Sequence, residues 1–335
     1  MTSMRPSVIS TDCFCSTVRT HSGLTTLVLT LLTGVAAAQS SNEIFETLVV
    51  SGTRIPDAVP GFRSSTVIDR SEIELRNDSD LVDLLSGIPG VHVNLPGSRG
   101  TDGEIFLRGG EPNFTTLFVD GVQVNDPTNS RGGSFDFSSL NVDNIEHIEI
   151  VRGPYSAIYG SDALSGAINV VTRGSSEEFD ASISTELGEH DLRSASAQLR
   201  GPVGESARVG FGLTSLEDGD ATTTDRFESD SLTVRADFTP SDNAAIAITF
   251  RTSDTESSAF PYSSGGPRLS TIRTLRQRRT DENSLSAAAR MRLSNSTGLH
   301  LTASHYEHAE ETISPGVAPA SFGGGIPPNS SDSKF

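Results

Sequence analysis

The sequence predicts a small α+β domain followed by part of a transmembrane antiparallel β-barrel. Three observations carry this prediction. From Glu43 to Thr172 the chain mixes helix and strand signals, whereas from about Phe179 onward apolar and polar residues alternate with period 2, as in strands with two unlike faces. The linkers between the alternating segments are short and long in turn, which is typical of outer-membrane barrels.

The N-terminal segment, residues 1–38, is predicted to be a secretory signal peptide. Its continuous apolar run, Leu24–Ala38, follows Arg5 and Arg19 and ends in small residues that fit a cleavage site. The run is shorter than the about 20 apolar residues that a membrane-spanning helix needs. An uncleaved N-terminal anchor is the alternative.

Composition excludes several classes of function for the secreted part of the chain. Cys13 and Cys15 lie in the predicted signal peptide, so disulfide frameworks, Cys-ligated zinc and thiol catalysis are not expected. The formal net charge of −18 argues against nucleic-acid binding, which needs clustered Lys and Arg. No nucleophile elbow, phosphate loop or paired His cluster appears, so the sequence does not indicate an enzyme.

Local signals before residue 172 predict two short helices and several strands. Ser71 and Glu74 have the spacing of a capping box, with Ser71 as the N-cap of a helix. A second helix is expected over Asp80–Ser86, with three leucines on one face and a glycine after it. Asp120 and Gly121 separate two apolar runs and predict a hairpin turn. Strands are expected at Val91–Asn94, Glu104–Arg108, Thr116–Val119 and Ile145–Val151.

The alternating region contains about seven predicted strands, each long enough to span a bilayer when tilted. Apart from the first linker, long linkers at Glu217–Glu228 and Ser253–Thr280 alternate with short ones at Gly201–Gly204 and Thr239–Asp242, which places the short linkers at the periplasmic end. A soluble β-sandwich would alternate in the same way and is the structural alternative. The strands contain Ala181–Leu187, Ala195–Leu199, Val209–Leu213, Leu232–Phe238, Ile246–Phe250, Leu285–Leu293 and Leu299–Ala303.

The end of the chain is not expected to supply a closing strand. Pro327–Lys334 is polar and proline-rich, so the match of Phe335 to the terminal Phe of many bacterial barrels is attributed to chance. Seven strands cannot close a membrane barrel, because an open edge leaves backbone groups unsatisfied in hydrocarbon. The chain is therefore expected to be the N-terminal part of a longer protein.

One stretch of the mixed region resembles the most characteristic part of the plug domain of TonB-dependent outer-membrane receptors. It runs from Ile145 to Thr172 and includes Ile-Val-Arg-Gly-Pro-Tyr-Ser and Ser-Gly-Ala-Ile-Asn-Val-Val. Companion motifs precede it in order at Leu84–Val91, Ile105–Gly109 and Leu117–Val122. The resemblance covers nearly all of Glu46–Arg173. Within the family the chain is most similar to the vitamin B12 (cobalamin) receptors, judged from Glu46–Arg54 and Tyr159–Ala163.

The resemblance implies a signal peptide at 1–38, a TonB box and flexible N-terminus at 39–55, an α+β plug domain at 56–174, and the truncated N-terminal part of a transmembrane barrel at 175–335. Plugged barrels have about 22 strands, of which about seven would be present. The implied function is TonB-dependent active transport by a monomer in the outer membrane of a Gram-negative bacterium. The implied partners are outer-membrane lipid, the C-terminal domain of TonB, and cobalamin or a related corrinoid.

Two other functions stay open at this point. A ferric-siderophore receptor is one, because siderophore sites gather the kinds of side chain found at Arg99, Phe114 and Arg131. A secreted β-sandwich binding module is the alternative from another class. It would be soluble without detergent.

The resemblance also implies residues that hold partners. A short β-branched segment after a flexible terminus suits addition of an edge strand to TonB, although an ordinary first strand of the plug is the alternative. Arg108 and Arg152, each followed by Gly, match family positions where plug arginines lock onto acidic residues of the inner barrel wall. The implied TonB box consists of Glu46, Thr47, Leu48, Val49 and Val50.

Ligand contacts are expected from outward-pointing plug loops rich in Asn, Ser and Gly, which could equally be ordinary turn residues. The candidates are Asn94, Ser98, Arg99, Asn113, Phe114, Asn125 and Arg131. Cobalamin receptors also bind Ca²⁺ in acidic barrel loops, with surface solvation as the alternative. The candidates for that metal site are Asp218, Asp220 and Asp225.

Overall fold

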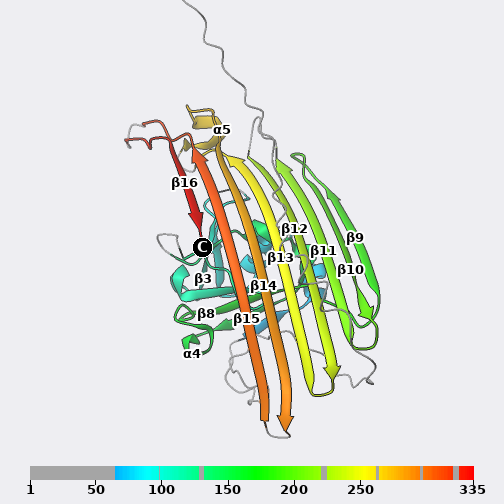
Figure 1. Ribbon diagram of the computed structural model, residues 1–335. Helices are drawn as coiled ribbons and strands as arrows, with labels where there is room; N and C mark the ends of the chain where they lie inside the picture. The colour runs from blue at the N-terminus through cyan, green and yellow to red at the C-terminus, as the bar shows by residue number, and fades with distance from the viewer. Residues whose placement is uncertain are drawn as a thin grey trace, which may run out of the picture. The chain divides into compact units, whose positions relative to one another are not determined.

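The structure is a computed structural model that describes residues 65–97, 99–127, 132–219, 225–261, 264–294, 297–319 and 324–335. All of these residues belong to one compact unit, Ala38–Phe335. The predicted signal peptide and the segment 39–55 lie outside the described residues. We call residues 65–172 the plug domain, and the sheet that follows it the large sheet (Figure 1).

The large sheet is an antiparallel meander in which each strand pairs with the next one along the chain. Short turns at 204–206 and 242–243 lie at one end of the strands, and the longer connections at 260–275 and 315–328 lie at the other. A short helix, α5 (Gly266–Leu269), lies in the first of these connections. The strands are β9 (Asp180–Leu187), β10 (Arg193–Val203), β11 (Ala207–Gly219), β12 (Arg226–Ser241), β13 (Ala244–Ala259), β14 (Arg276–Ser294), β15 (Thr297–Ser314) and β16 (Asn329–Lys334).

All seven predicted strands are present, but most extend further than expected. The connection expected at Ser253–Thr280 is shorter, because β13 continues to Ala259 and β14 begins at Arg276. The backbone keeps pairing there although the apolar alternation has ended. The polar segment Asn329–Lys334 also forms a strand, β16, which pairs with the end of β15. It is an edge strand of the sheet and not a closing strand, as the sequence predicts for the tail.

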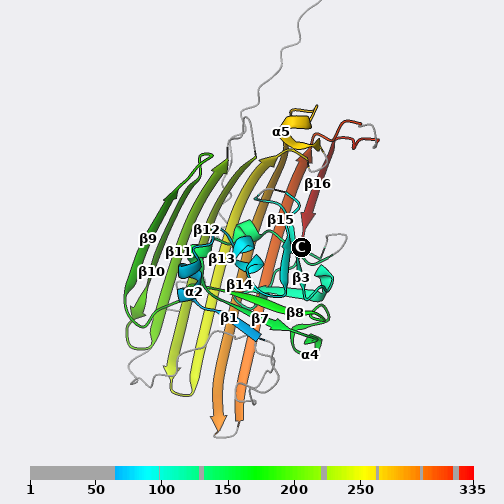
Figure 2. The same cartoon turned by 180° about the vertical axis from the view of Figure 1, so that it is seen from behind.

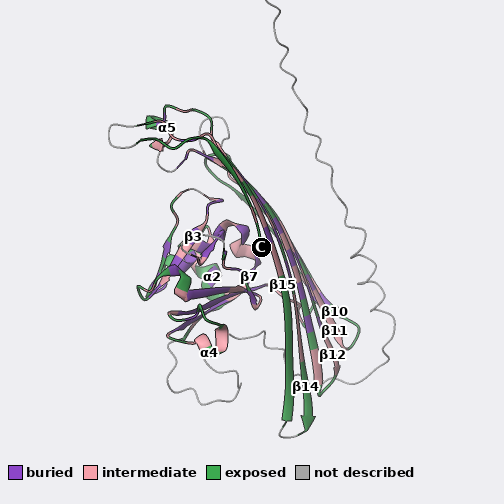
Figure 3. Ribbon diagram, turned by 60° about the vertical axis from the view of Figure 1, so that its left-hand side comes forward, coloured by how far each residue is buried: buried purple, intermediate pink, exposed green. Residues whose placement is uncertain are grey.

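The two faces of the large sheet differ in chemistry and burial. On the outer face the apolar side chains are exposed, among them Phe211, Leu213, Ile248, Leu285, Leu293 and Leu301. On the inner face the intervening residues are polar and buried, among them Gln198, Thr233, Arg251, Thr280 and Glu282. A β-sandwich would bury the apolar set instead. The plug domain lies against the inner face, and its interior is buried (Figure 3).

The plug domain contains two small sheets and several one- or two-turn helices around one apolar core (Figure 2). None of the helices in the described segments is both long enough and apolar enough to cross a membrane. The five-stranded sheet has the order β1 (Ser65–Ile68), β7 (Ile145–Arg152), β8 (Gly166–Thr172), β4 (Thr115–Val119), β5 (Val122–Gln123), and the three-stranded sheet the order β2 (Val91–Asn94), β3 (Gly103–Leu107), β6 (Ser134–Phe135). The helices are α2 (Arg70–Arg76), α3 (Leu81–Ser86), α4 (Ser156–Tyr159), η1 (Pro112–Phe114), η2 (Phe137–Ser139) and η3 (Val142–Asn144).

Most local predictions for the plug domain are confirmed. Helix α3 has Asp80 as its N-cap, and its three leucines are fully buried. Asp120 and Gly121 both have positive φ and join β4 to β5, as a type I′ hairpin turn requires. The N-cap expected at Ser71 was wrong. Asp69 caps α2 by accepting a hydrogen bond from the Glu72 amide, and the Ser71 hydroxyl donates to the same carboxylate.

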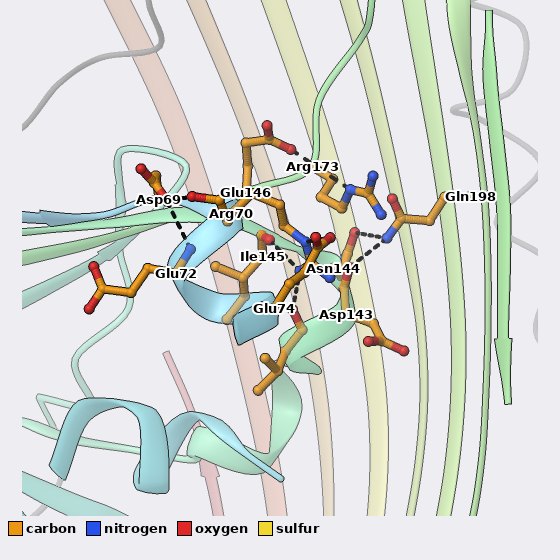
Figure 4. Close-up of polar contacts among 12 residues, drawn as sticks. Asp69, Arg70, Glu72, Glu74, Asp143, Asn144, Ile145, Glu146, Arg173 and Gln198 are labelled. Carbon is orange, nitrogen blue, oxygen red and sulfur yellow. Dashed lines mark hydrogen bonds and ion pairs between the residues drawn. The ribbon is translucent and has the colours of Figure 1, made fainter. Parts of the chain in front are cut away.

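The segment of residues 142–146 fastens the plug domain to β10 and β12 (Figure 4). The Gln198 amide donates to the backbone oxygen of Asp143 at 2.9 Å, and the Asn144 amide donates to the Thr233 hydroxyl at 2.9 Å. Within the plug, Arg70 donates to the backbone oxygens of Val142 and Ile145 at 3.0 and 2.9 Å. This segment is therefore held from both sides.

The connection from the plug domain to β9 lies directly on the inner face. A Cβ at Gly210 would come within 2.6 Å of the Gly174 carbonyl oxygen, so the two backbones approach closely because residue 210 is glycine. The Ser175 hydroxyl hydrogen-bonds the Asp237 carboxylate of β12. Further on, Phe179 packs over Gly201 of β10. The connection is thus bound along its path.

Candidate functional site

A buried charge cluster centred on Arg278 joins the plug domain to the large sheet. Arg278 projects from the inner face of β14, and its guanidinium donates to Asp136 at 2.7 Å and to Asp102 at 2.6 Å. It also donates to the backbone oxygen of Gly100 at 2.7 Å and to Glu310 of β15 at 3.0 Å. One side chain of the sheet therefore holds three separate points of the plug. We call this cluster the Arg278 junction.

The plug elements place these acceptors by local rules. Asp136 caps η2, since its carboxylate accepts from the Ser138 amide at 3.0 Å, and this fixes the other oxygen toward Arg278. Asp102 precedes β3, and Gly100 turns the chain toward it with φ of 76°. A Cβ at Gly100 would lie 2.6 Å from the Ser257 side chain and 2.8 Å from Phe227, so only glycine allows this close approach to β12 and β13.

The electrostatics of the Arg278 junction are those of a desolvated ion pair. The Asp136 side chain is 0% exposed and that of Arg278 is 4% exposed. Burial raises the pKa of the Asp136 carboxyl, while the Arg278 guanidinium lowers it. Burial likewise raises the pKa of the Asp102 carboxyl to about 6, against the opposing effect of Arg278. Removing Arg278 would leave the buried Asp136 carboxylate without its charged partner, which is strongly destabilising.

A second buried arginine reinforces the junction from β13. Arg251 donates to the backbone oxygen of Ser139 at 3.3 Å and to Glu282 of β14 at 2.7 Å. Both charged side chains are 2% exposed. The Glu282 carboxylate also lies 3.5 Å from the imidazole of His308. Arg251 and Arg278 together fix η2 to the inner face.

Arg99 forms a looser bridge between the plug and the sheet. Its guanidinium lies 3.5 Å from the Asp80 carboxylate at the start of α3, and 3.4 Å from the Asp218 carboxylate of β11. Both carboxylates are 31% exposed. Arg99 is one of the predicted ligand residues. The structure places it in these ion pairs, and its contact with a ligand stays a prediction.

The other predicted ligand residues are spread over several elements of the plug. Asn94 ends β2 and donates to Glu104 at 3.4 Å, while Asn113 and Phe114 lie in η1. The Asn125 side chain holds its own loop, because it accepts from the Leu117 amide at 2.6 Å and donates to the backbone oxygens of Thr115 and Gly133. Ser98 and Arg131 lie outside the described residues, as does the TonB box expected at Glu46–Val50.

The two predicted plug-lock arginines have different surroundings. Arg152 is buried and donates to the Thr66 hydroxyl at 2.7 Å and to the backbone oxygen of Pro89 at 3.1 Å, both within the plug domain. Arg108 is exposed and has a positive φ of 53°. Their pairing with acidic residues of a barrel wall stays a prediction. Among the described residues, Arg278 pairs with plug carboxylates from the sheet side, whereas Arg99 of the plug pairs with Asp218 of the sheet.

The predicted calcium ligands are not gathered into a metal site in the described segments. Asp218 is paired with Arg99, and the Asp225 carboxylate accepts from the Phe260 amide at 3.4 Å. Asp220 lies outside the described residues. No group of three His, Cys, Asp or Glu side chains suited to a metal ion occurs in the part of the chain that the structure describes.

Sequence reasoning missed Arg278, Arg251, Asp102 and Asp136. Arg278 lay inside the linker expected at Ser253–Thr280, so no face was assigned to it. The available signal is the period-2 pattern continued past the apolar residues, because Arg278, Thr280 and Glu282 share the inner face. Asp136 precedes a short turn that the sequence does not mark.

The comparisons with known proteins agree with this architecture. Residues 61–167 match the family described as the TonB-dependent Receptor Plug Domain. Two curated proteins, each named "Vitamin B12 transporter BtuB", come from strains of Vibrio vulnificus. The CMCP6 protein is 38% identical over 139 residues, 41% of this chain and 22% of the relative, and the YJ016 protein is 34% identical over 167 residues, 50% of this chain and 27% of the relative. The chain spans about a quarter of the length of these relatives.

Solved structures with the same fold include two receptors. The siderophore receptor PirA from Acinetobacter baumannii superposes with a TM-score of 0.60 at 18% identity, over 81% of this chain and 43% of PirA. The ferric yersiniabactin uptake receptor FyuA from Yersinia pestis gives a TM-score of 0.60 at 20% identity, over 76% of this chain and 42% of FyuA. At these identities the likeness establishes the fold alone.

Proposed function

This chain belongs to the TonB-dependent receptors, and on that premise we propose that it takes part in energised uptake of cobalamin or a related corrinoid across the outer membrane of a Gram-negative bacterium. The single observation that carries the proposal is the position of the plug domain. Arg278 fastens it to the polar inner face of a sheet whose apolar side chains are exposed on the opposite face. Such a sheet suits a barrel wall with lipid outside and a plugged lumen inside.

The orientation follows from the connections between strands. Outer-membrane barrels have short periplasmic turns and longer external loops. The turns at 204–206 and 242–243 would then face the periplasm, and the connections at 260–275 and 315–328 the outside. In this orientation the Arg278 junction lies in the external half of the wall, since Arg278 is close to the start of β14.

The proposed ligand class rests on the relatives named as vitamin B12 transporters. Loops rich in Asn, Ser and Gly offer donors and acceptors to the amide groups of a corrinoid, and Asn94 and Asn113 are exposed. The proposed partner that delivers energy from the inner-membrane proton gradient is TonB, which would pair with Glu46–Val50 by β-strand addition.

The test is uptake of radiolabelled cobalamin by Gram-negative cells that lack their own cobalamin receptor and produce this protein. We expect TonB-dependent accumulation that unlabelled cobalamin competes away. Accumulation of a ferric siderophore instead of cobalamin would show that the ligand is a siderophore. Binding and uptake that do not depend on TonB would contradict the proposed mechanism.

A proline in the proposed TonB box separates binding from energised transport. Leu48→Pro or Val49→Pro removes a backbone donor from the pairing strand, so uptake should be abolished while surface binding of ligand is kept. Ser41→Pro, upstream of the segment, is the control and should transport normally. Loss of binding together with uptake would refute the assignment of Glu46–Val50.

A further inference from the structure

A small cavity separates helix α3 of the plug from strand β11 of the large sheet. Its volume is about 30 Å³, room for about two water molecules. Leu216 lines it from β11, and the plug contributes the opposite side. The plug residues that line it include Asp80, Val82, Leu95, Arg99, Phe137 and Asn141. We call this interface the α3–β11 seam.

Arg99 spans the seam, and its two ion pairs differ from those of Arg278. The N–O separations are 3.4 and 3.5 Å at Arg99, against 2.6 and 2.7 Å between Arg278 and the plug carboxylates. Arg99 is 19% exposed and its carboxylates are 31% exposed, whereas Arg278 is 4% exposed and its partners Asp136 and Asp102 are 0% and 27% exposed. The Arg99 pairs are therefore long and partly solvated.

This difference means that the free-energy cost of separating plug and sheet is lower at the Arg99 ion pairs than at the Arg278 ion pairs. Breaking a partly exposed ion pair costs little, because water solvates both groups afterwards. Breaking a buried pair leaves charges without solvent, which costs far more. The apolar contact at the seam is already interrupted by the cavity. Of these two charged contacts, the one at α3 and β11 should therefore open before the Arg278 junction.

We propose that the plug separates from the wall at the α3–β11 seam during transport, and that Arg99 is the positioning residue that keeps this seam closed at rest. This proposal rests on the proposed transport function and adds to it the place where the plug separates from the wall. Arg99 holds the start of α3 through Asp80 and the wall through Asp218, so it releases both when its side chain moves.

The first test needs no ligand. Leu216→Cys places a thiol in the cavity, and Cys13 and Cys15 both lie in the predicted signal peptide. In membranes of producing cells, a small maleimide should label this thiol about five-fold faster when Arg99→Ala is added, the population change expected from losing an ion pair of ~1 kcal/mol. Asp218→Asn, which breaks the wall-side pair alone, should also accelerate labelling.

Arg76→Ala is the matched control. Arg76 pairs with Asp78 at 2.7 Å and donates to the backbone oxygen of Leu84, so it also supports α3, but these contacts lie within the plug. Its loss should leave the labelling rate of Leu216→Cys unchanged. Equal rates with and without Arg99, or equal acceleration by Arg76→Ala, would overturn the proposal.

The second test asks whether opening is needed for transport. Arg99→Cys and Asp218→Cys are joined with a cleavable bismaleimide in intact cells. Uptake of labelled cobalamin should be lost on cross-linking and regained on cleavage, with surface binding kept throughout. Full uptake by the cross-linked protein would overturn the route. If the unmodified protein took up no cobalamin, the ligand proposal would fail, whereas the labelling result would still decide the role of Arg99.

Discussion

The guanidinium of Arg278 on β14 lies 2.7 Å from the fully buried carboxylate of Asp136 in the plug domain. These residues are far apart in the sequence and come from two differently folded parts of the chain. Losing one partner of such a buried ion pair is strongly destabilising, because the other partner is then left charged without solvent. The position of the plug therefore depends on Arg278.

Replacing Arg278 should destabilise the plug on the wall. Arg278→Ala is expected to cost about 3–5 kcal/mol, the cost of breaking a buried ion pair, and to make the plug sensitive to protease added to outer membranes. The control is Arg279→Ala, on the adjacent residue and the exposed face, where Arg279 is 52% exposed and the change should stay within about 0.5 kcal/mol. Equal protease sensitivity of the two variants would contradict the assigned role.

The junction should weaken as the pH rises. The pKa of Asp102 is raised by burial from 3.8 to about 6, so its charged form is disfavoured in the folded protein. The protonated Asp102 carboxyl therefore stabilises the folded protein below about pH 4, and this stabilisation is lost as the pH rises through about 6. The charges that act on Asp102 are Arg278, which opposes the shift, and Asp136, Glu310 and Asp126, which add to it.

Asp102→Asn tests this pH dependence. The thermal midpoint of the purified protein in detergent should fall between pH 4 and pH 6 more steeply in the unmodified protein than in the variant. The comparison of slopes removes the contribution of other titrating groups. Parallel curves for the two proteins would show that Asp102 does not titrate in this range.

Alanine substitutions at two glycines with the same backbone conformation distinguish the cost of a steric clash with the sheet from the cost of backbone strain. Gly100 and Gly109 have φ of 76° and 77°, so alanine carries a similar backbone penalty of about 1–2 kcal/mol at each. A Cβ at Gly100 would also meet Ser257 and Phe227, whereas one at Gly109 would meet nothing within 4 Å. Gly100→Ala should therefore lower the thermal midpoint further than Gly109→Ala. Equal losses would mean that the contact with the wall is not tight.

A charged substitution on the outer face near the middle of a strand should be destabilising. Leu213 is 56% exposed on the apolar face of β11, and Leu213→Arg is expected to cost about 2–4 kcal/mol if this face meets lipid at the bilayer midplane. Glu217→Arg, on the same face nearer the strand end, is the control and should be tolerated. Yield of heat-modifiable protein in the outer membrane measures both. Normal yield of Leu213→Arg would contradict a lipid-facing role.

Local signals predicted a helix or hairpin well where all the residues that determine it lie in one short segment. Helix α3 is defined by Asp80 at its start and three leucines on one face, and the β4–β5 hairpin by Asp120 and Gly121. The cap of α2 was misassigned because Asp69 and Ser71 are both good caps, and only the backbone geometry distinguishes them. Strand ends were underestimated because polar residues pair as well as apolar ones once a neighbouring strand is present.

The candidate site was less predictable because its residues meet only in the folded chain. Nothing near Asp136 in the sequence marks an ion pair with residue 278. Arg99 was predicted as a ligand contact from its loop, but its neighbours Asp80 and Asp218 come from a helix and from a distant strand. Such contacts depend on the register of β11 and β14 against the plug, which no local pattern determines.

The close contact of Gly174 with Gly210 holds the C-terminal end of the plug against β11. Because the connection lies flat on the strands and is held again at Ser175, it has no slack to release when the other end is pulled. The C-terminal end of the plug is thus a fixed tether. A larger residue at position 210 would lift that tether from the strands, because its Cβ would meet the backbone of Gly174.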